Sequence, residues 1–232
     1  MNIIDIVVIL IILMSGIVGF KRGVFKELVM TVGFAIVFII SFKLKNPLAE
    51  WLSLHLPFFN FGNMFNNVGI INVIFYQVIA FIVIFSLIMI VFNIILVVTS
   101  IFEKILKYTI ILGIPSKILG LLVGLIEGYI IAFIVMFVVS QPMFGDITGN
   151  SKLKGPMLNS TPILTNVVSE MNDTVIDIYN LKDSTNDDKK LERDITKIML
   201  EHNLVEPDYI IKLIDANKIE IDNANELLRP YR

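Results

Sequence analysis

Four unbroken apolar runs constrain the fold of this chain more than any other feature. They cover Ile3 to Phe20, Val24 to Phe42, Ile70 to Phe102 and Ile118 to Val139. A helix needs about 20 mainly apolar residues to cross a bilayer, because the hydrocarbon core is roughly 30 Å thick. Lipid cannot satisfy free backbone polar groups, and barrel strands would alternate apolar with polar residues. The runs therefore predict an all-α, polytopic integral membrane protein with four transmembrane helices.

The composition agrees with this class and divides the chain. Of the 232 residues 56% are apolar and 17% charged, against about 45 to 50% and about 25% in soluble domains. Residues 1–140 carry 8 basic and 5 acidic side chains, whereas residues 141–232 carry 11 and 16. This shift predicts a transmembrane domain over 1–140 and a polar, acidic, extramembrane tail over 141–232.

The basic residues predict the orientation of the chain, because loops rich in Lys and Arg stay in the cytoplasm. The first and third loops hold three each: Lys21, Arg22, Lys26 and Lys104, Lys107, Lys117. We therefore expect these loops inside, and the N-terminus, second loop and C-terminal tail outside. No basic residue precedes Lys21, so the first run is expected to be a retained helix rather than a cleaved signal peptide.

The second loop and the third run are each unusual. Residues 47–56 read PLAEWLSLHL and place a tryptophan on an apolar helical face, which suits an interfacial helix. An ordinary connector fits these residues equally well, and both interpretations stay open. The third run has 33 residues and would span ~50 Å as a helix, so we expect it to tilt, bend or protrude.

Glycines recur at helical spacing in two places. The positions are Gly16, Gly19 and Gly23 along the first helix and its exit, and Gly120, Gly124 and Gly128 in the fourth helix. Small residues let helix backbones approach closely, which matters in lipid because the hydrophobic drive for association is missing there. Both sets predict helix-packing faces. Neither indicates any chemistry.

Glu127 lies near the middle of the fourth predicted helix, where a charge costs roughly 2.5 kcal/mol or more. Such a group is protonated, paired or facing water. One interpretation is a proton or cation site, assisted by Asn93 or Gln77 of the third helix. The other, which we favour, is a neutral glutamic acid hydrogen-bonded across a packed interface.

Glu27 is a second carboxylate, one turn past Gly23 and near the cytoplasmic boundary. Three basic side chains, those of Lys26, Arg22 and Lys117, are expected at the same membrane level. We therefore expect Glu27 to form a structural ion pair.

Two blocks of the sequence have a familiar order and spacing. The first joins Met1–Asp5 to Gly19–Leu28, and the second runs from Ile114 to Gly128. With Ser160-Thr161-Pro162, they resemble the CvpA family, the colicin V production proteins, over about Met1 to Leu181. The resemblance implies a small bacterial inner-membrane protein, linked to bacteriocin production or export and to envelope homeostasis, without established catalytic chemistry.

The resemblance also selects individual positions. Residues that match the family's recurrent ones are Asp5, Arg22, Gly23, Glu27, Gly120, Gly124 and Gly128. Asp5, Arg22, Glu27 and Glu127 are accordingly the candidate intramembrane charge sites. The chain departs from the family at Ser116-Lys117, where an acidic-basic pair is usual, and at Glu127, where arginine is usual. Any role that the family's arginine has at this position is therefore not expected of Glu127.

The tail is predicted to be helical. Thr161 and Pro162 are typical of a helix start, and apolar residues recur at helical spacing over 162–181. This amphipathic helix could pack on the membrane surface or on the rest of the tail. Residues 187–230 predict a small helical module, with Asp222 capping its last turn. A core of this size is marginal, so we expect it to lean on a partner, the membrane or a second copy.

These observations favour a non-enzymatic accessory or scaffold protein of the inner membrane. The alternative is a small oligomeric proton, ion or solute transporter or channel subunit that uses Glu127. No catalytic, cofactor-binding or metal-ligating residue is predicted, because the chain has no cysteine and only two distant histidines, His55 and His202. Expected partners are the lipid bilayer and either a second copy or other envelope and secretion membrane proteins. Nucleic acid is not expected, since the tail is acidic.

Overall fold

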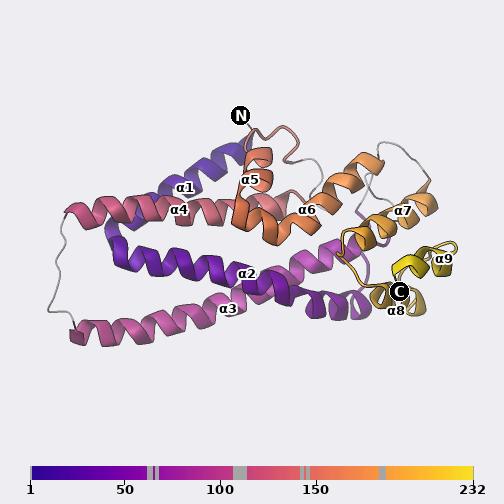
Figure 1. Ribbon diagram of the computed structural model, residues 1–232, viewed down its shortest axis with the longest axis horizontal. Helices are drawn as coiled ribbons and strands as arrows, with labels where there is room; N and C mark the ends of the chain where they lie inside the picture. Colours follow the sequence, from indigo (N-terminus) through magenta and orange to yellow (C-terminus); the bar gives the residue numbers. More distant parts are fainter. Residues whose placement is uncertain are drawn as a thin grey trace. The chain divides into compact units, whose positions relative to one another are not determined.

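The computed structural model describes residues 2–61, 65, 68–106, 114–141, 144, 147–182 and 187–231. These residues are all helical apart from their turns and connections, and four helices are long and apolar enough to cross a membrane (Figure 1). The four are α1 (Ile3–Arg22), α2 (Val24–His55), α3 (Ile71–Leu106) and α4 (Ile114–Val139). The predicted fold class is confirmed.

The second apolar run continues further than predicted. α2 does not stop at Phe42 but extends through Pro47 to His55. Residues 47–56 are thus mostly helical, as one interpretation required, yet they continue α2 instead of forming a separate interfacial helix. A proline inside a helix removes one backbone hydrogen bond, and such losses are tolerated in membrane helices where neighbouring groups compensate. α3 has 36 residues. It is therefore longer than a bilayer-spanning helix needs to be, as the long third apolar run predicts.

The remaining helices belong to the tail. They are α5 (Lys154–Ser160), α6 (Pro162–Lys182), α7 (Asp188–Glu201), α8 (Pro207–Asp215), α9 (Ala224–Leu228) and the 3-10 helix η3 (Arg229–Tyr231). α6 covers the residues 162–181 for which the sequence predicts an amphipathic helix. The predicted cap at Asp222 is wrong, because Asn223 in the left-handed region (φ 55°) is the N-cap of α9, a conformation that asparagine tolerates better than most residues.

The chain folds into two compact units. Unit 1 comprises Met1–Leu44, Phe81–Val138 and Thr148–Ser160, and unit 2 comprises Lys45–Ala80, Val139–Ile147 and Thr161–Arg232. α2 and α3 each contribute to both units. Both units also combine residues from the two sides of position 140, the boundary predicted from composition.

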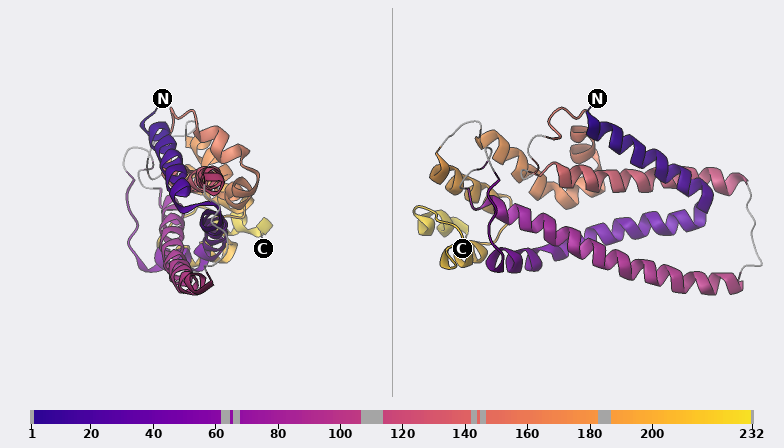
Figure 2. Two further views of the ribbon diagram at one scale, coloured as in Figure 1. Left: turned by 90° about the vertical axis from the view of Figure 1, so that its left-hand side faces the viewer. Right: turned by 180° about the vertical axis from the view of Figure 1, so that it is seen from behind.

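The core of unit 1 has an aromatic cluster. Phe38 lies at its centre, with its ring centroid 6.2 Å from that of Phe42, 5.7 Å from Phe81 and 6.0 Å from Phe133. The last two pairs are edge-to-face, an arrangement worth about 0.5 to 1.5 kcal/mol beyond burial of area. This cluster fixes α2 against α3 and α4. Figure 2 shows α1 crossing α4 on the other side of the same unit.

The core of unit 2 joins the tail to the end of α2 and the beginning of α3. Buried apolar residues come from each of these elements: Ala49, Ile70, Ile71, Ile74, Val168, Met171, Ile178, Ile195, Met199, Ile210 and Leu213. The side chain of Gln77 in α3 donates a hydrogen bond to the carbonyl of Leu204 in the tail, at 3.0 Å. The small tail module therefore packs against residues 45–80 of its own chain.

Candidate functional site

The glycines of α1 and α4 lie where the two backbones meet. A Cβ added at Gly19 would lie 2.2 Å from the carbonyl oxygen of Gly120, and one added at Gly124 would lie 2.5 Å from that of Ser15. A Cβ at Gly128 would lie 2.8 Å from Cα of Ile12. Real Cβ atoms do not approach backbone this closely, so only glycine fits at these positions.

Gly16 and Gly23 complete the set in different ways. A Cβ on Gly16 would meet only side-chain atoms, at 2.8 Å from Leu125 Cδ2. Gly23 is the single residue between α1 and α2 and has φ 82° and ψ 163°, a region of backbone conformation essentially restricted to glycine. The backbone N–H of Val24 then donates to Ser116 Oγ of α4 at 3.3 Å. Gly23 therefore turns the chain at the level where α4 begins.

This turn brings three of the four predicted charge sites together. Nη1 of Arg22 lies 3.5 Å from Oε2 of Glu27 and 3.8 Å from Oε2 of Glu127. The side chain of Arg22 is 33% exposed, whereas those of Glu27 and Glu127 are 0% and 6% exposed. One guanidinium at the end of α1 thus faces two buried carboxyls, one from α2 and one from α4.

The chemistry of this charge cluster follows from its burial. Charges are costly to bury unless they are paired and hydrogen-bonded, and removing one partner of a buried pair leaves an uncompensated charge. Arg22 donates a hydrogen bond to Glu27, but Oε1 of Glu27 and Oε2 of Glu127 have no hydrogen-bond partner within the described residues. The arrangement can hold three helices together, and its carboxyl oxygens could also accept a proton or a cation.

The two α3 side chains that one interpretation placed beside Glu127 have other hydrogen-bond partners. Gln77 donates instead to Leu204, and Asn93 is exposed and donates to the carbonyl of Met89, one turn back in its own helix. Of the three basic residues proposed for Glu27, the described ion pair is with Arg22.

Asp5, the fourth predicted charge site, lies apart from the cluster at the beginning of α1. It is buried, and its Oδ2 accepts a hydrogen bond from the backbone N–H of Asn2 at 3.0 Å, as in a capping box. Ser151 Oγ donates to Oδ1 at 2.6 Å, and the N–H groups of Lys152 and Leu153 point to the carboxyl at 3.4 Å. Asp5 thus ties the start of α1 to the segment that leads into α5.

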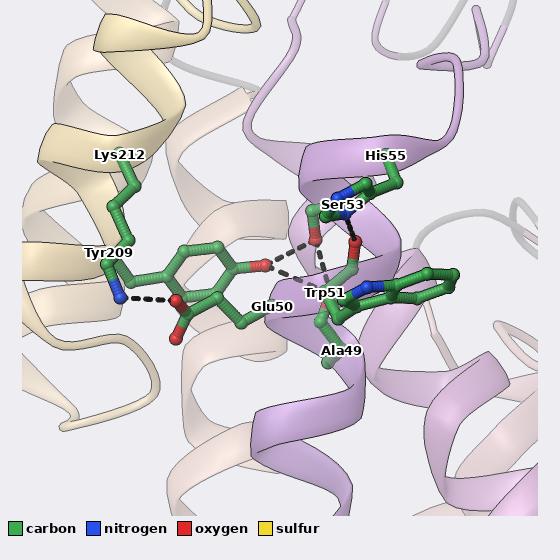
Figure 3. A network of polar contacts seen from close by, with 7 residues as sticks. All are labelled: Ala49, Glu50, Trp51, Ser53, His55, Tyr209 and Lys212. Carbon is green, nitrogen blue, oxygen red and sulfur yellow. Dashed lines mark hydrogen bonds and ion pairs between the residues drawn. The ribbon is translucent and has the colours of Figure 1, made fainter.

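A second polar network, in unit 2, connects α8 to the end of α2 (Figure 3). The hydroxyl groups of Tyr209 and Ser53 share a short hydrogen bond, and Ser53 Oγ donates to the carbonyl of Ala49 at 2.6 Å. Lys212 Nζ donates to Glu50 Oε1 at 2.5 Å. Burial raises the pKa of Tyr209, and the hydrogen bond to Glu50 raises the pKa of Lys212. Both groups keep their protons near neutral pH and act as donors.

Trp51 and His55 lie beside the second network at the end of α2 (Figure 3), where they contact each other. His55 stacks on Trp51 with ring centroids 4.7 Å apart and contacts the Trp51 carbonyl through Nδ1 at 2.8 Å. His202 Nε2 lies 2.7 Å from Oδ2 of Asp177, joining α7 to α6.

Glu192 of α7 is buried and makes a contact that the sequence did not predict. Its Oε1 accepts a hydrogen bond from the backbone N–H of Ile70 at 2.9 Å, directly before α3. Desolvation by burial raises the pKa of Glu192 to about 7, with a smaller contribution from Asp188, although the backbone hydrogen bonds oppose the shift. No local pattern marks this residue, because its partner lies 122 positions away.

The fold and these contacts define a class: a multi-pass helical membrane protein with four candidate spans, packed through glycines around a buried charge cluster. The family model of the colicin V production protein matches residues 4–162. Since this is more than half of the chain, the protein belongs to the colicin V production family. No curated protein and no solved structure matches the chain.

Proposed function

We propose that the protein is a non-enzymatic accessory or scaffold protein of the bacterial inner membrane, linked to bacteriocin production or export and to envelope homeostasis. Membership of the colicin V production family supports this link. In the proposed orientation the N-terminus and the tail lie outside, and the protein acts on other envelope or secretion membrane proteins, or on a second copy, by binding them.

The observation that carries this proposal is the position of the Glu27 carboxyl between two glycines. Its Oε1 would lie 3.0 Å from a Cβ on Gly19 and 3.0 Å from a Cβ on Gly124. The carboxyl thus fills the space that side chains on α1 and α4 would need, while Arg22 contacts it from the end of α1. Charges placed inside a backbone contact favour a role in holding helices together.

The alternative function is a small oligomeric transporter or channel subunit for protons, ions or solutes. It is favoured by one observation, the buried carboxyl oxygens of Glu27 and Glu127 that lack hydrogen-bond partners among the described residues. Ionisable groups inside membrane segments often mark proton relays and ion pathways.

Complementation of envelope stress resistance separates the two functions through substitutions of Glu127. Glu127→Gln keeps the shape and hydrogen-bonding capacity but cannot ionise, so a scaffold tolerates it. Glu127→Leu is expected to be harmful, because it loses an interhelical polar contact typically worth about 0.6 and up to about 1.7 kcal/mol. Leu122→Ala, on an exposed side of α4, is the control for expression. Loss of function in Glu127→Gln with unchanged protein level would favour the transporter.

A further inference from the structure

One exposed face of α3 carries two polar side chains, those of Ser86 and Asn93. Ser86, Ile90, Asn93 and Val97 are spaced four, three and four residues apart, so they lie on one side of the helix, and all four are exposed. We call these residues the α3 stripe. The face contains no charged residue.

Asn93 belongs to the third candidate membrane span, Ile71–Val97. Glu103, the first charged residue toward the C-terminal end of α3, is ten positions away, which is ~15 Å along a helix. That distance is half of a hydrocarbon core of roughly 30 Å. Asn93 is therefore placed inside the hydrocarbon core, within the candidate span Ile71–Val97.

The local hydrogen bonds use only part of the polar capacity of the stripe. Asn93 Nδ2 donates to the carbonyl of Met89 at 2.8 Å, and Ser86 Oγ donates to that of Ile82 at 2.7 Å. An asparagine amide has two N–H donors and a carbonyl acceptor, and within the described part of the chain the bond to Met89 is the one hydrogen bond that the Asn93 side chain makes. Lipid offers no hydrogen-bond partner for the second N–H and the carbonyl oxygen of the amide, so another helix must supply one.

The inner face of α3 is already occupied by its own chain. A Cβ on Gly33 of α2 would lie 1.9 Å from Cζ of Phe92, so the phenyl ring of Phe92 packs directly on the α2 backbone. The α3 stripe lies on a different side of the helix from Phe92. A partner for it must come from outside this unit.

We propose that the α3 stripe is the interface with α3 of a second copy of this chain. The amide supports this occupant because it is self-complementary: each Asn93 can donate to and accept from the same side chain across a two-fold axis. Ser86 and Asn93 are also seven residues apart, the spacing that left-handed helix pairs require. A single Asn at such a position fixes register and oligomeric state. This inference depends on the membrane class of the protein and not on its proposed scaffold role.

Cysteine cross-linking in native membranes tests the proposal directly, because the 232-residue chain has no cysteine of its own. Ile90→Cys and Val97→Cys lie on the stripe, whereas Leu87→Cys and Val91→Cys are equally exposed on another side of α3. Oxidation is expected to give a dimer several-fold more readily for the first two. Equal yields at all four positions, or no dimer at any, would overturn the interface.

A second set of variants tests the role of the amide. In the Val97→Cys background, Asn93→Leu is expected to weaken the dimer by about threefold to about twentyfold, and Asn93→Gln to restore most of it. Unchanged cross-linking in Asn93→Leu would refute the amide contact. If the stripe cysteines instead cross-link to a different membrane protein and give no dimer, the second copy is the wrong occupant.

Discussion

Gly19 and Gly120 meet backbone to backbone. A Cβ on Gly19 would lie 2.2 Å from the carbonyl oxygen of Gly120, and a Cβ on Gly120 would lie 2.4 Å from that of Gly19. At this contact there is no room for a side chain between α1 and α4. It also sets the depth at which the side chain of Arg22, three residues further along α1, reaches Glu127 of α4 at 3.8 Å.

The first prediction concerns the close backbone contact. Gly120→Ala and Gly124→Leu are expected to destabilise the protein by about 1 to 3 kcal/mol or more, because the added atoms overlap backbone that cannot move aside. Thermal unfolding in mild detergent measures the loss.

Two control substitutions accompany this measurement. A Cβ on Gly155 in α5 would have nothing within 4 Å, so Gly155→Ala is expected to be neutral or slightly stabilising, since alanine favours helix. Leu122→Ala changes an exposed side chain of α4 and is expected to matter little. Equal effects in all four variants would show that the α1–α4 contact is not the source of stability.

The second prediction concerns the turn between α1 and α2. Gly23→Ala is expected to cost about 1 to 3 kcal/mol, because its φ of 82° and ψ of 163° strain any residue with a side chain. Arg22 and Val24 should then shift together, so the variant should also lose part of the stabilisation from the charge cluster. The double variant Gly23→Ala with Glu127→Leu tests this coupling, since strictly additive losses would show that turn and cluster are independent.

The third prediction concerns pH and Glu192. Its pKa of about 7 in the folded protein lies above the ordinary value of 4.5. The folded state therefore binds the proton more tightly, and the stability from Glu192 is fully present below about pH 4.5 and is lost as pH rises through about 7. Unit 2 is expected to unfold at a lower temperature at about pH 8 than at about pH 5.

Glu192→Gln isolates this effect, because glutamine still accepts the hydrogen bond from the Ile70 N–H but cannot ionise. The variant is expected to be more stable than the natural chain at the higher pH and to show a smaller difference between the two pH values. A pH dependence identical to that of the natural chain would assign the titration to other groups.

The fourth prediction is the orientation. Asp5 and Ser151 are hydrogen-bonded at 2.6 Å, so the start of α1 and the segment after α4 lie on the same side of the membrane. Cysteines at Ile3 and Ile163 should react with an impermeant thiol reagent in intact cells, and one at Ile114 should not. All three positions are at least 70% exposed, so the accessibility of the side chain does not confuse the result. Labelling at Ile114 alone would reverse the orientation.

Much of unit 1 could be predicted because its signals are local. Glycines four residues apart lie on one helical face wherever the helix packs, so Gly120, Gly124 and Gly128 were recognisable without a partner. The contact between Arg22 and Glu127 could not be predicted, because it depends on the turn at Gly23 and on how far a long side chain reaches. The intrahelical bond of Asn93 was equally hidden, since its sequence position suggested a role beside Glu127.

Unit 2 was harder to predict for a related reason. Pro47 and the charged residues around it are typical of a loop, yet α2 continues to His55 because residues such as Ser53 and Ala49 pack against the tail. The tail helices themselves were predictable from their apolar spacing. Their packing partner was not, because contacts such as Ile70 with Glu192 join residues 122 positions apart.

The most direct test of a structural role for Glu127 is proton flux through the purified protein in liposomes under an imposed potential. Glu127 is part of a buried charge cluster, and we infer that this cluster holds α1, α2 and α4 together. We therefore predict the same flux as in empty liposomes, both for the natural chain and for Glu127→Gln. A flux in the natural chain that Glu127→Gln abolishes, while the variant keeps its thermal stability, would contradict this inference.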